Sequence, residues 1–230
     1  MIRVLIERDG SLREGEAHHL QVRRVEPGES VELRDGEGLV GSGTLRRLGK
    51  RWSVELSGTD RVAPPPPLVL AVGAGDRERF AWVVEKATEL GVSVVIPLDC
   101  ERTEGVATRV RPQQLERLRR HALEAVKQSG AAWATRVEEP MPLHALLQQP
   151  SDGARWLADA AGRPAPATVG VGRLTVVIGP EGGLTDAERE RVLAAGYDPI
   201  RLAAHTLRFE TAAVAAVAVA VAGRLRGGHG

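Results

Sequence analysis

Cysteine is almost absent from this sequence, because Cys100 is the only one among 230 residues. A single cysteine excludes a disulfide framework and a cysteine-rich zinc site, and it indicates a reducing compartment. No positively charged apolar leader opens the chain, so we expect no export signal. The longest apolar run, residues 212–223, is too short to span a bilayer. We therefore expect a cytoplasmic protein with no membrane partner.

Lysine is also scarce and occurs only at Lys50, Lys86 and Lys127, so that arginine supplies nearly all of the positive charge. Arginine forks suit the recognition of phosphate and carboxylate groups, although a GC-rich genome produces the same bias. The formal net charge is only +1. This near-neutral total does not exclude nucleic acid binding, because a local basic patch is sufficient.

Metal ligands are equally few. His18 and His19 are adjacent, and no further ligands follow them at the spacing of a metal site. We therefore expect no metal.

Four consecutive prolines, residues 64–67, mark the clearest boundary, because they continue neither a sheet nor a helix and favour a stiff linker. Upstream, short β-like runs are separated by glycine and charged turns, which is typical of a small barrel or sandwich. One expected helix, residues 16–25, interrupts these runs. We predict two domains, residues 1–66 and residues 67–230.

Downstream of the prolines, strands alternate with helices. Apolar runs predict strands at residues 68–73, 92–98, 155–160, 174–180 and 199–203. The segments around them predict helices at residues 76–91, 112–130, 185–196 and 210–226. This rhythm predicts an α/β domain with a mostly parallel sheet that is covered on both faces.

The stretch "VIGPEGGLTDAERE", residues 177–190, indicates a buried strand, a glycine-rich bend and a helix start. It lacks the lysine of a P-loop and the glycine spacing of a dinucleotide fingerprint. Its glycines allow close approach of a ligand and positive φ angles. Thr185 and Glu188 have the spacing of a capping box, which starts the helix at Asp186. From spacing alone, a ligand-binding loop and a purely structural turn are equally good interpretations.

A second loop, "LAAHTLRFETAAVAAV" at residues 202–217, again follows a strand and enters a helix. Arg208 and Glu210 lie at the mouth of that helix, and the small residues Thr211, Ala212 and Ala213 leave room for a ligand or a second subunit. A helix of alanine and valine is apolar on every side, so its neighbours must bury it. The alternative for Arg208 and Glu210 is a local ion pair at a helix end.

Taken together, "IGPEGGLTDAE" and "LRFETAA" resemble the signature of the bacterial 16S ribosomal RNA uracil-N3 methyltransferases of the SPOUT superfamily. Three further stretches agree with this resemblance and follow in the same order, "HHLQVRRVEPGESVEL", "VVEKATELGVSVVIPLDCERT" and "LEAVKQSG". The resemblance therefore covers nearly the whole chain.

The resemblance implies a small N-terminal PUA-like β-barrel that helps to bind RNA, and a C-terminal SPOUT domain with a deep trefoil knot. It also implies a homodimer, and S-adenosylmethionine as cofactor, held by three loops. Carried over by motif, the residues expected to bind it are Leu157, Ala158, Ile178, Gly179, Pro180, Glu181, Gly182, Gly183, Leu202, Ala203, Thr206, Leu207, Arg208, Thr211, Ala212 and Ala213.

The implied reaction moves a methyl group from a sulfonium to N3 of a uracil, which must first lose its proton. We assign to Arg208 the stabilisation of negative charge on the uracil carbonyl oxygens. Glu210 or Glu181 is the proposed proton acceptor or an orienting partner. The alternative is that Glu210 only holds Arg208.

The implied partner is 16S ribosomal RNA, free or in the small ribosomal subunit. Arginines are expected to bind its phosphates, and the candidates are Arg23, Arg24, Arg46, Arg47, Arg51, Arg119 and Arg120. Two other functions stay open: a SPOUT methyltransferase that acts on another RNA position, and a nonenzymatic RNA-binding factor of ribosome assembly.

Overall fold

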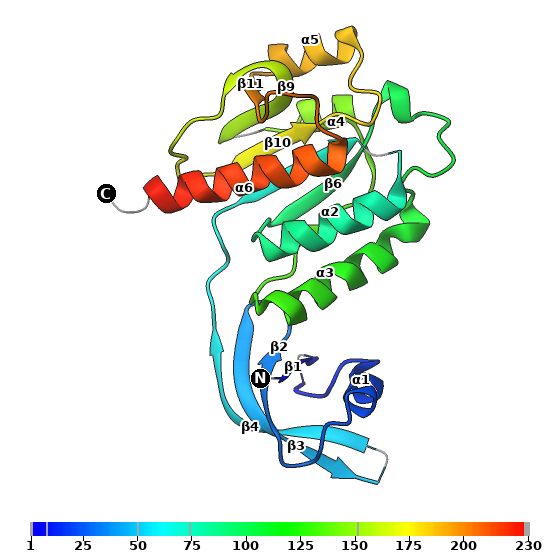
Figure 1. Cartoon of the computed structure of the whole chain (residues 1–230), viewed down its shortest axis with the longest axis vertical. Coiled ribbons are helices and arrows are strands. Elements are labelled where there is room, and N and C mark those ends of the chain that lie inside the picture. Colours follow the sequence, from blue (N-terminus) through cyan, green and yellow to red (C-terminus); the bar gives the residue numbers. More distant parts are fainter. Residues whose placement is uncertain (1, 8, 50, 74, 151, 228–230) are drawn as a thin grey trace. The chain divides into compact units, whose positions relative to one another are not determined.

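The structure is a computed structural model that describes residues 2–7, 9–49, 51–73, 75–150 and 152–227. It contains two compact units (Figure 1). The first comprises Met1–Pro65 and Leu123–Ala134, and the second comprises Pro66–Ala122 and Thr135–Gly230. The division falls within the run of four prolines.

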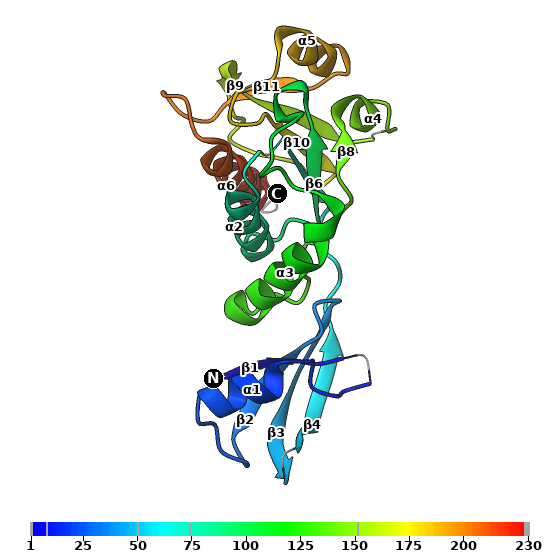
Figure 2. The ribbon, with the colours of Figure 1, turned by 90° about the vertical axis from the view of Figure 1, so that its right-hand side faces the viewer.

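The first unit is built on a four-stranded sheet with the order β1-β2-β3-β4 (Figure 2). Its strands are β1 (Ile2–Leu5), β2 (Ser30–Arg34), β3 (Leu39–Leu48) and β4 (Arg51–Arg61). The pair β1 and β2 is parallel, whereas the other two pairs are antiparallel. The helix α1 (Glu16–Val22) is shorter than the helix predicted over residues 16–25.

The expected barrel is not closed by strand pairing, since no described residue of β1 pairs with β4. The helix α1 contributes the fully buried side chain of Leu20 to the core, where it joins Val4, Val31 and Leu45. A helix side chain therefore supplies apolar contacts to the core of this open sheet.

The first unit also contains Leu123–Ala134, which the sequence assigned to the C-terminal domain. Trp133 Nε1 donates a hydrogen bond to the carbonyl oxygen of Val62 at 3.0 Å. Lys127 Nζ lies 2.8 Å from a carboxylate oxygen of Glu16, and both side chains are almost fully buried. These bonds join segments that are far apart in the sequence, so no local sequence pattern predicts them.

The second unit confirms the predicted parallel α/β architecture. Its main strands are β5 (Leu68–Gly73), β6 (Val94–Asp99), β9 (Ala154–Pro164), β10 (Leu174–Ile178) and β11 (Asp198–Arg201). The sheet order is β11-β9-β10-β5-β6-β7, where β7 is Arg136–Val137, and the short β8 (Met141–Pro142) pairs with β6. All pairs in this sheet are parallel. The trefoil knot implied by the resemblance stays a prediction.

Helices cover both faces of this sheet, which is why the central strand β5 is buried along its whole length. The helices α2 (Arg77–Glu89) and α6 (Phe209–Gly227) pack against each other, and α6 contacts β5 and β10 (Figure 1). On the other face, α4 (Leu143–Leu147) and α5 (Asp186–Ala194) contribute side chains to a core with Val69, Ala71 and Val177. The remaining helices are η1 (Glu101–Thr103), η2 (Pro112–Gln114) and α3 (Leu115–Ser129).

The start of α5 agrees with the sequence. The Thr185 hydroxyl accepts a hydrogen bond from Glu188 N at 3.2 Å, and the Glu188 carboxylate accepts one from Thr185 N at 2.9 Å. This capping box begins the helix at Asp186, as predicted.

The end of α6 is fixed to the start of the sheet. The Arg224 guanidinium donates hydrogen bonds to the carbonyl oxygens of Pro66, Pro67 and Gly172 at 2.7–2.9 Å. One residue earlier, Gly223 lies so close to Val169 that a Cβ atom would be 2.6 Å from Val169 Cγ2. Among the described residues, no helix combines the length and apolar character that a membrane span requires.

We predict that Gly223→Ala lowers the free energy of unfolding by about 1–3 kcal/mol, because the added methyl overpacks the contact with Val169. Helix propensity alone predicts the opposite sign, a gain of about 1 kcal/mol. Urea denaturation measures the difference. Gly170→Ala is the matched control, since a Cβ at Gly170 meets nothing within 4 Å. A Gly223→Ala protein that is more stable than the parent contradicts the close contact.

Candidate functional site

A cavity of about 280 Å³ lies at the carboxyl ends of the central strands of the second unit. Its walls come from the middle of β9, from the end of β10 with the turn that follows it, and from the segment that leads from β11 into α6, and Arg189 of α5 completes them. Ligands of open parallel α/β sheets bind at this edge, where loops from neighbouring strands converge. The volume is close to the lower end of the range for small-molecule pockets.

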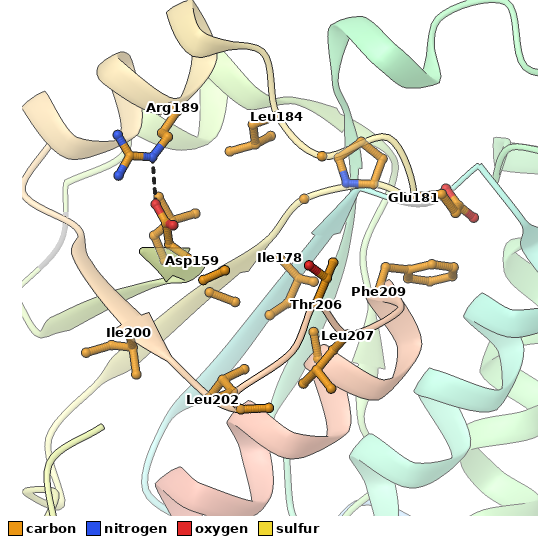
Figure 3. A pocket seen from close by; sticks show the side chains of 18 of the residues that line it. Asp159, Ile178, Glu181, Leu184, Arg189, Ile200, Leu202, Thr206, Leu207 and Phe209 are labelled. Atoms are coloured by element: carbon orange, nitrogen blue, oxygen red, sulfur yellow. Dashed lines mark hydrogen bonds and ion pairs between the residues drawn. The ribbon is translucent and has the colours of Figure 1, made fainter. Parts of the chain in front are cut away.

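The inner part of this cavity is apolar. Ile178, Ile200, Leu202 and Leu207 project into it from β10, β11 and the segment that follows β11 (Figure 3). Ile178 ends β10, and its side chain is almost fully buried. Such a lining suits a flat heterocycle, which gains free energy when its apolar faces leave water.

One side of the cavity carries an ion pair between Asp159 and Arg189 (Figure 3). Arg189 Nε lies 2.6 Å from Asp159 Oδ2, and the second carboxylate oxygen accepts a hydrogen bond from Ala161 N at 2.8 Å. The Asp159 side chain is 13% exposed, so the carboxylate belongs to the wall and not to the outer surface. This pair provides a charged acceptor beside an apolar pocket.

Glu181 ties the glycine-rich turn to the start of α2. Its two carboxylate oxygens accept hydrogen bonds from Gly75 N at 3.0 Å and Asp76 N at 3.1 Å. In Figure 3 the carboxylate turns away from the apolar side chains of the cavity. Amides at a helix N-terminus favour a negative partner, so this carboxylate fixes the position of the turn.

Glu188 makes a second tie on the other side of the turn. Its side chain is buried, and besides capping α5 it accepts a hydrogen bond from Glu101 N at 2.8 Å. Arg102, in the same short helix as Glu101, donates a hydrogen bond to the carbonyl oxygen of Gly182. The loop after β6 therefore holds the turn in place.

The first turns of α2 and α6 bring Arg79 and Glu210 together. Arg79 Nη1 lies 3.7 Å from Glu210 Oε1, and Arg79 Nε lies 3.8 Å from Asp76 Oδ2. The other Glu210 oxygen, Oε2, is buried and has no hydrogen-bond partner among the described residues. The ion pair of Glu210 is thus formed with Arg79, whereas the sequence suggested Arg208. Arg208 is exposed and follows Leu207, which lines the cavity.

The cysteine thiol has no nucleophilic role here. Cys100 is 4% exposed, and burial raises the pKa of its thiol to about 12, helped by the nearby Glu188, Asp99 and Glu101 carboxylates. The thiol therefore stays protonated at neutral pH, and a protonated thiol is a poor nucleophile.

Most of the residues expected from the motifs to bind the cofactor line this cavity. They are Leu157, Ala158, Ile178, Gly179, Pro180, Glu181, Gly183, Leu202, Ala203, Thr206, Leu207 and Ala212. Gly182, Arg208, Thr211 and Ala213 do not line it. Arg208 and Thr211 are exposed, Ala213 is buried inside α6 packing, and Gly182 faces Arg102.

The sequence missed seven residues that line the cavity, namely Asp159, Ala160, Leu184, Arg189, Ile200, His205 and Phe209. Most of them lie next to or between the residues that the motifs marked, so extending each motif by one or two residues includes them. Arg189 is different, because it lies in the first turn of α5, where it lines the cavity beside its ion-pair partner Asp159.

The arginines expected to bind RNA differ in how free their side chains are. Arg46 pairs with Glu55, Arg47 lies 5.3 Å from the centre of the Trp52 ring, and Arg119 bonds to Val137 and Glu116. Arg46 and Arg47 are nevertheless exposed, as are Arg23, Arg24, Arg51 and Arg120, whereas Arg119 is half-buried. Exposed guanidinium groups are the better candidates for phosphate contacts, and all seven assignments stay predictions.

Comparison with known proteins agrees with this architecture. Residues 63–221 match the RNA methyltransferase domain family, and residues 12–51 match the RNA methyltransferase PUA domain family. A protein of Aquifex aeolicus named ribosomal RNA small subunit methyltransferase E is 30% identical over 220 residues, which are 93% of this chain and 95% of that protein. A protein of the same name from Mycobacterium bovis is 32% identical over 218 residues, 87% of this chain and 80% of that protein.

Two solved structures have the same fold. The ribosomal RNA small subunit methyltransferase E of Neisseria gonorrhoeae, crystallised with S-adenosylmethionine, superposes with a TM-score of 0.82 at 26% identity and 95% coverage of both chains. A probable rRNA methyltransferase of Porphyromonas gingivalis gives a TM-score of 0.80 at 27% identity, with 95% of this chain and 96% of that chain covered. The match of the methyltransferase domain to more than half of the chain, together with the 30% identity to the Aquifex protein, shows that this chain belongs to the ribosomal RNA small subunit methyltransferase E family of RNA methyltransferases.

Proposed function

We propose that this protein transfers a methyl group from S-adenosylmethionine to N3 of a uridine in 16S ribosomal RNA of the small ribosomal subunit. The observation that carries the proposal is the cavity at the strand ends, which combines an apolar slot with the bordering ion pair of Asp159 and Arg189 in a chain of this family. We place the protein in the cytoplasm, where small subunits are assembled.

The residues present fit S-adenosylmethionine. The aliphatic side chains of Ile178, Leu202 and Leu207 suit the faces of the adenine, and the main chain of the glycine-rich turn allows close approach. The ion pair of Asp159 and Arg189 borders the same cavity and offers hydrogen-bond partners to the polar groups of the ligand. When bound, this cofactor supplies a methyl group on a positively charged sulfur, which is already an activated leaving group.

The chain has to align the acceptor nitrogen with that methyl group and to take up the proton of N3. Positioning alone accounts for a large part of such accelerations. Glu210 suits the proton transfer, because one of its carboxylate oxygens is buried and unpartnered among the described residues. Glu181 is the weaker candidate, since main-chain amides occupy both of its oxygens. The role assigned to Arg208 stays a prediction.

The acceptor must leave its base pair, because N3 lies on the pairing edge of uracil, and we expect an unpaired or flipped nucleotide. Phosphate contacts from exposed arginines provide the affinity for the RNA backbone and make it depend on salt concentration.

We also propose a homodimer that forms through α6. Several apolar residues of this helix are only half-buried in one chain, namely Val214, Ala215, Ala218, Val219, Val221 and Ala222. Leu225, on the last turn, is 65% exposed. A contiguous apolar strip on one helix marks a surface for another protein, and the resemblance found in the sequence implies a homodimer.

Mass spectrometry of ribosomal RNA tests the proposed reaction. We expect purified small subunits or 16S RNA, incubated with the protein and methyl-labelled S-adenosylmethionine, to yield labelled 3-methyluridine after nuclease digestion. Label on a ribose oxygen, on a carbon atom or on transfer RNA indicates a different methyltransferase. No transfer, with cofactor binding retained, favours a nonenzymatic assembly factor.

Filling the cavity tests the cofactor site. Ala203 lines the cavity and its neighbour Ala204 is exposed and does not, so Ala203→Phe and Ala204→Phe form a matched pair. We expect Ala203→Phe to weaken the binding of S-adenosylmethionine at least about tenfold in calorimetric titration, which is equivalent to about 1.4 kcal/mol. We expect Ala204→Phe to leave the affinity unchanged. Equal affinities of the two variants place the cofactor elsewhere.

A charge on the apolar strip of α6 tests the dimer. We expect Ala218→Glu to convert the protein to monomers in sedimentation velocity, because an interface does not accommodate an unpaired buried carboxylate. Ala187→Glu makes the same change on an exposed position of α5 and serves as the control. A parent protein that sediments as a monomer at micromolar concentration rejects the dimer.

A further inference from the structure

We propose that Arg79 and Glu210 together read the base-pairing edge of the target uracil, and that Arg79 stabilises the negative charge that forms on the base. The inference rests on the proposed function and names the residues that select its acceptor. Arg79 is not part of the motif carried over from the sequence.

The first observation is that the Arg79 guanidinium lies between two carboxylates without a hydrogen bond to either. Its nitrogen atoms are 3.7 Å from Glu210 Oε1 and 3.8 Å from Asp76 Oδ2, and hydrogen bonds of this type are 2.7–3.2 Å long. The side chain is 42% exposed, so an incoming base reaches it. The two carboxylates hold the guanidinium in place and leave its donors available.

The second observation concerns the partner of Arg79. Glu210 Oε2 is buried, and no described residue donates a hydrogen bond to it. The side chain as a whole is only 14% exposed, so little water reaches it. A buried acceptor without a donor is costly, and such atoms are rare in folded proteins. Phe209 and Ala212, on either side of Glu210 in the chain, line the cofactor cavity. Glu210 therefore stands in the chain between two residues of the cavity wall, and we place its unpartnered oxygen beside the reacting methyl group.

The other carboxylates nearby are already engaged. Asp76 Oδ1 accepts hydrogen bonds from Glu78 N and Arg79 N and caps α2. Glu181 accepts from the amides of Gly75 and Asp76. The other Asp76 oxygen belongs to a side chain that is 40% exposed to water. Glu210 is thus the carboxylate of this group with a buried oxygen that lacks a donor.

The pair presents a donor beside an acceptor, and this arrangement is complementary to uracil. The pairing edge of uracil carries the N3–H donor between two carbonyl oxygens, so Glu210 accepts from N3–H while Arg79 donates to a neighbouring carbonyl oxygen. Cytosine has a lone pair at N3 in place of the proton, and a carboxylate repels it. The pair therefore selects uracil against cytosine and places N3 next to a proton acceptor.

The same contacts account for the chemical step. The proton of N3 passes to the Glu210 carboxylate, and the nitrogen lone pair forms the new bond to the methyl carbon. The carbon–sulfur bond breaks with its electron pair remaining on sulfur, so the sulfonium becomes a neutral thioether. The negative charge that spreads over the uracil carbonyl oxygens is stabilised by Arg79, and the carboxyl proton is finally released to water.

The test compares Arg79→Gln and Arg79→Lys with Arg77→Gln, which removes one charge from an exposed position of the same turn. Single-turnover transfer is measured with saturating S-adenosylmethionine on RNA that contains uridine or 5-fluorouridine, whose N3 proton is more acidic. Removing one donor of this kind costs about 10²–10³ in rate, and we expect that loss for Arg79→Gln. The lysine variant should retain part of the rate, and Arg77→Gln nearly all of it.

Substrate chemistry separates stabilisation of the base from a structural role. We compare the rate of Arg79→Gln with that of the parent protein on each substrate. We expect this rate deficit to be at least about tenfold smaller with 5-fluorouridine than with uridine, because a more acidic N3 needs less help from a donor. A binding readout independent of transfer uses the demethylated cofactor and RNA with uridine or cytidine at the methylated position. The parent protein should prefer uridine, and Arg79→Gln and Glu210→Gln should lose this preference.

Two results overturn the inference while leaving the proposed function intact. One is an equal loss of rate for Arg79→Gln and Arg77→Gln in a parent protein that makes 3-methyluridine. The other is a rate deficit that 5-fluorouridine does not reduce, with the uridine preference retained. If the parent protein instead methylates a different atom, the proposed function fails first and the inference fails with it.

Discussion

The geometry of the cavity depends on two carboxylates that fasten the glycine-rich turn after β10. Glu181 binds the amides at the start of α2, and the buried Glu188 binds both the cap of α5 and the amide of Glu101 after β6. A turn rich in glycine is flexible by itself, because glycine restricts φ and ψ so little. The ties to neighbouring strand ends convert this flexible segment into a fixed wall, and a fixed wall binds a ligand without first losing entropy.

The parallel sheet explains why those strand ends meet. The central strands β5 and β10 are buried on both faces, so their side chains pack in the core. Polar functional groups therefore have to come from the loops and helix ends at the edge of the sheet. All strands point the same way, and their carboxyl ends therefore bring the starts of α2 and α6 to one edge. Arg79 and Glu210 approach each other for this reason, although they are far apart in the sequence and share no local motif.

The helix α6 lines the cavity at its first turn and is attached to the sheet at its last turns. Its first turn carries Glu210 and places Phe209 and Ala212 on the cavity wall. Its last turns hold the helix to the sheet through the carbonyl bonds of Arg224 and the close approach of Gly223 to Val169. The small residues between these ends allow the close packing of α6 against α2, β5 and β10. The position of the first turn of α6 is thus set partly by contacts at the far end of the same helix.

The sequence by itself determined the order of the five main strands and of α2, α3, α5 and α6 in the second unit, because apolar runs and capping residues act over a few neighbours. It did not predict the short elements β7, β8 and α4. The start of α5 at Asp186 is the clearest case, since Thr185 and Glu188 meet within one turn. The motifs at residues 178–183 and 207–213 also located two of the three segments that form the cavity. The inclusion of Leu123–Ala134 in the first unit was decided only by the tertiary structure, and so was each charged contact of the site. The Asp159–Arg189 pair spans 30 positions and the Gly75–Glu181 bond spans 106. Which of many arginines and glutamates become partners over such separations depends on strand order and packing, and these are properties of the folded chain.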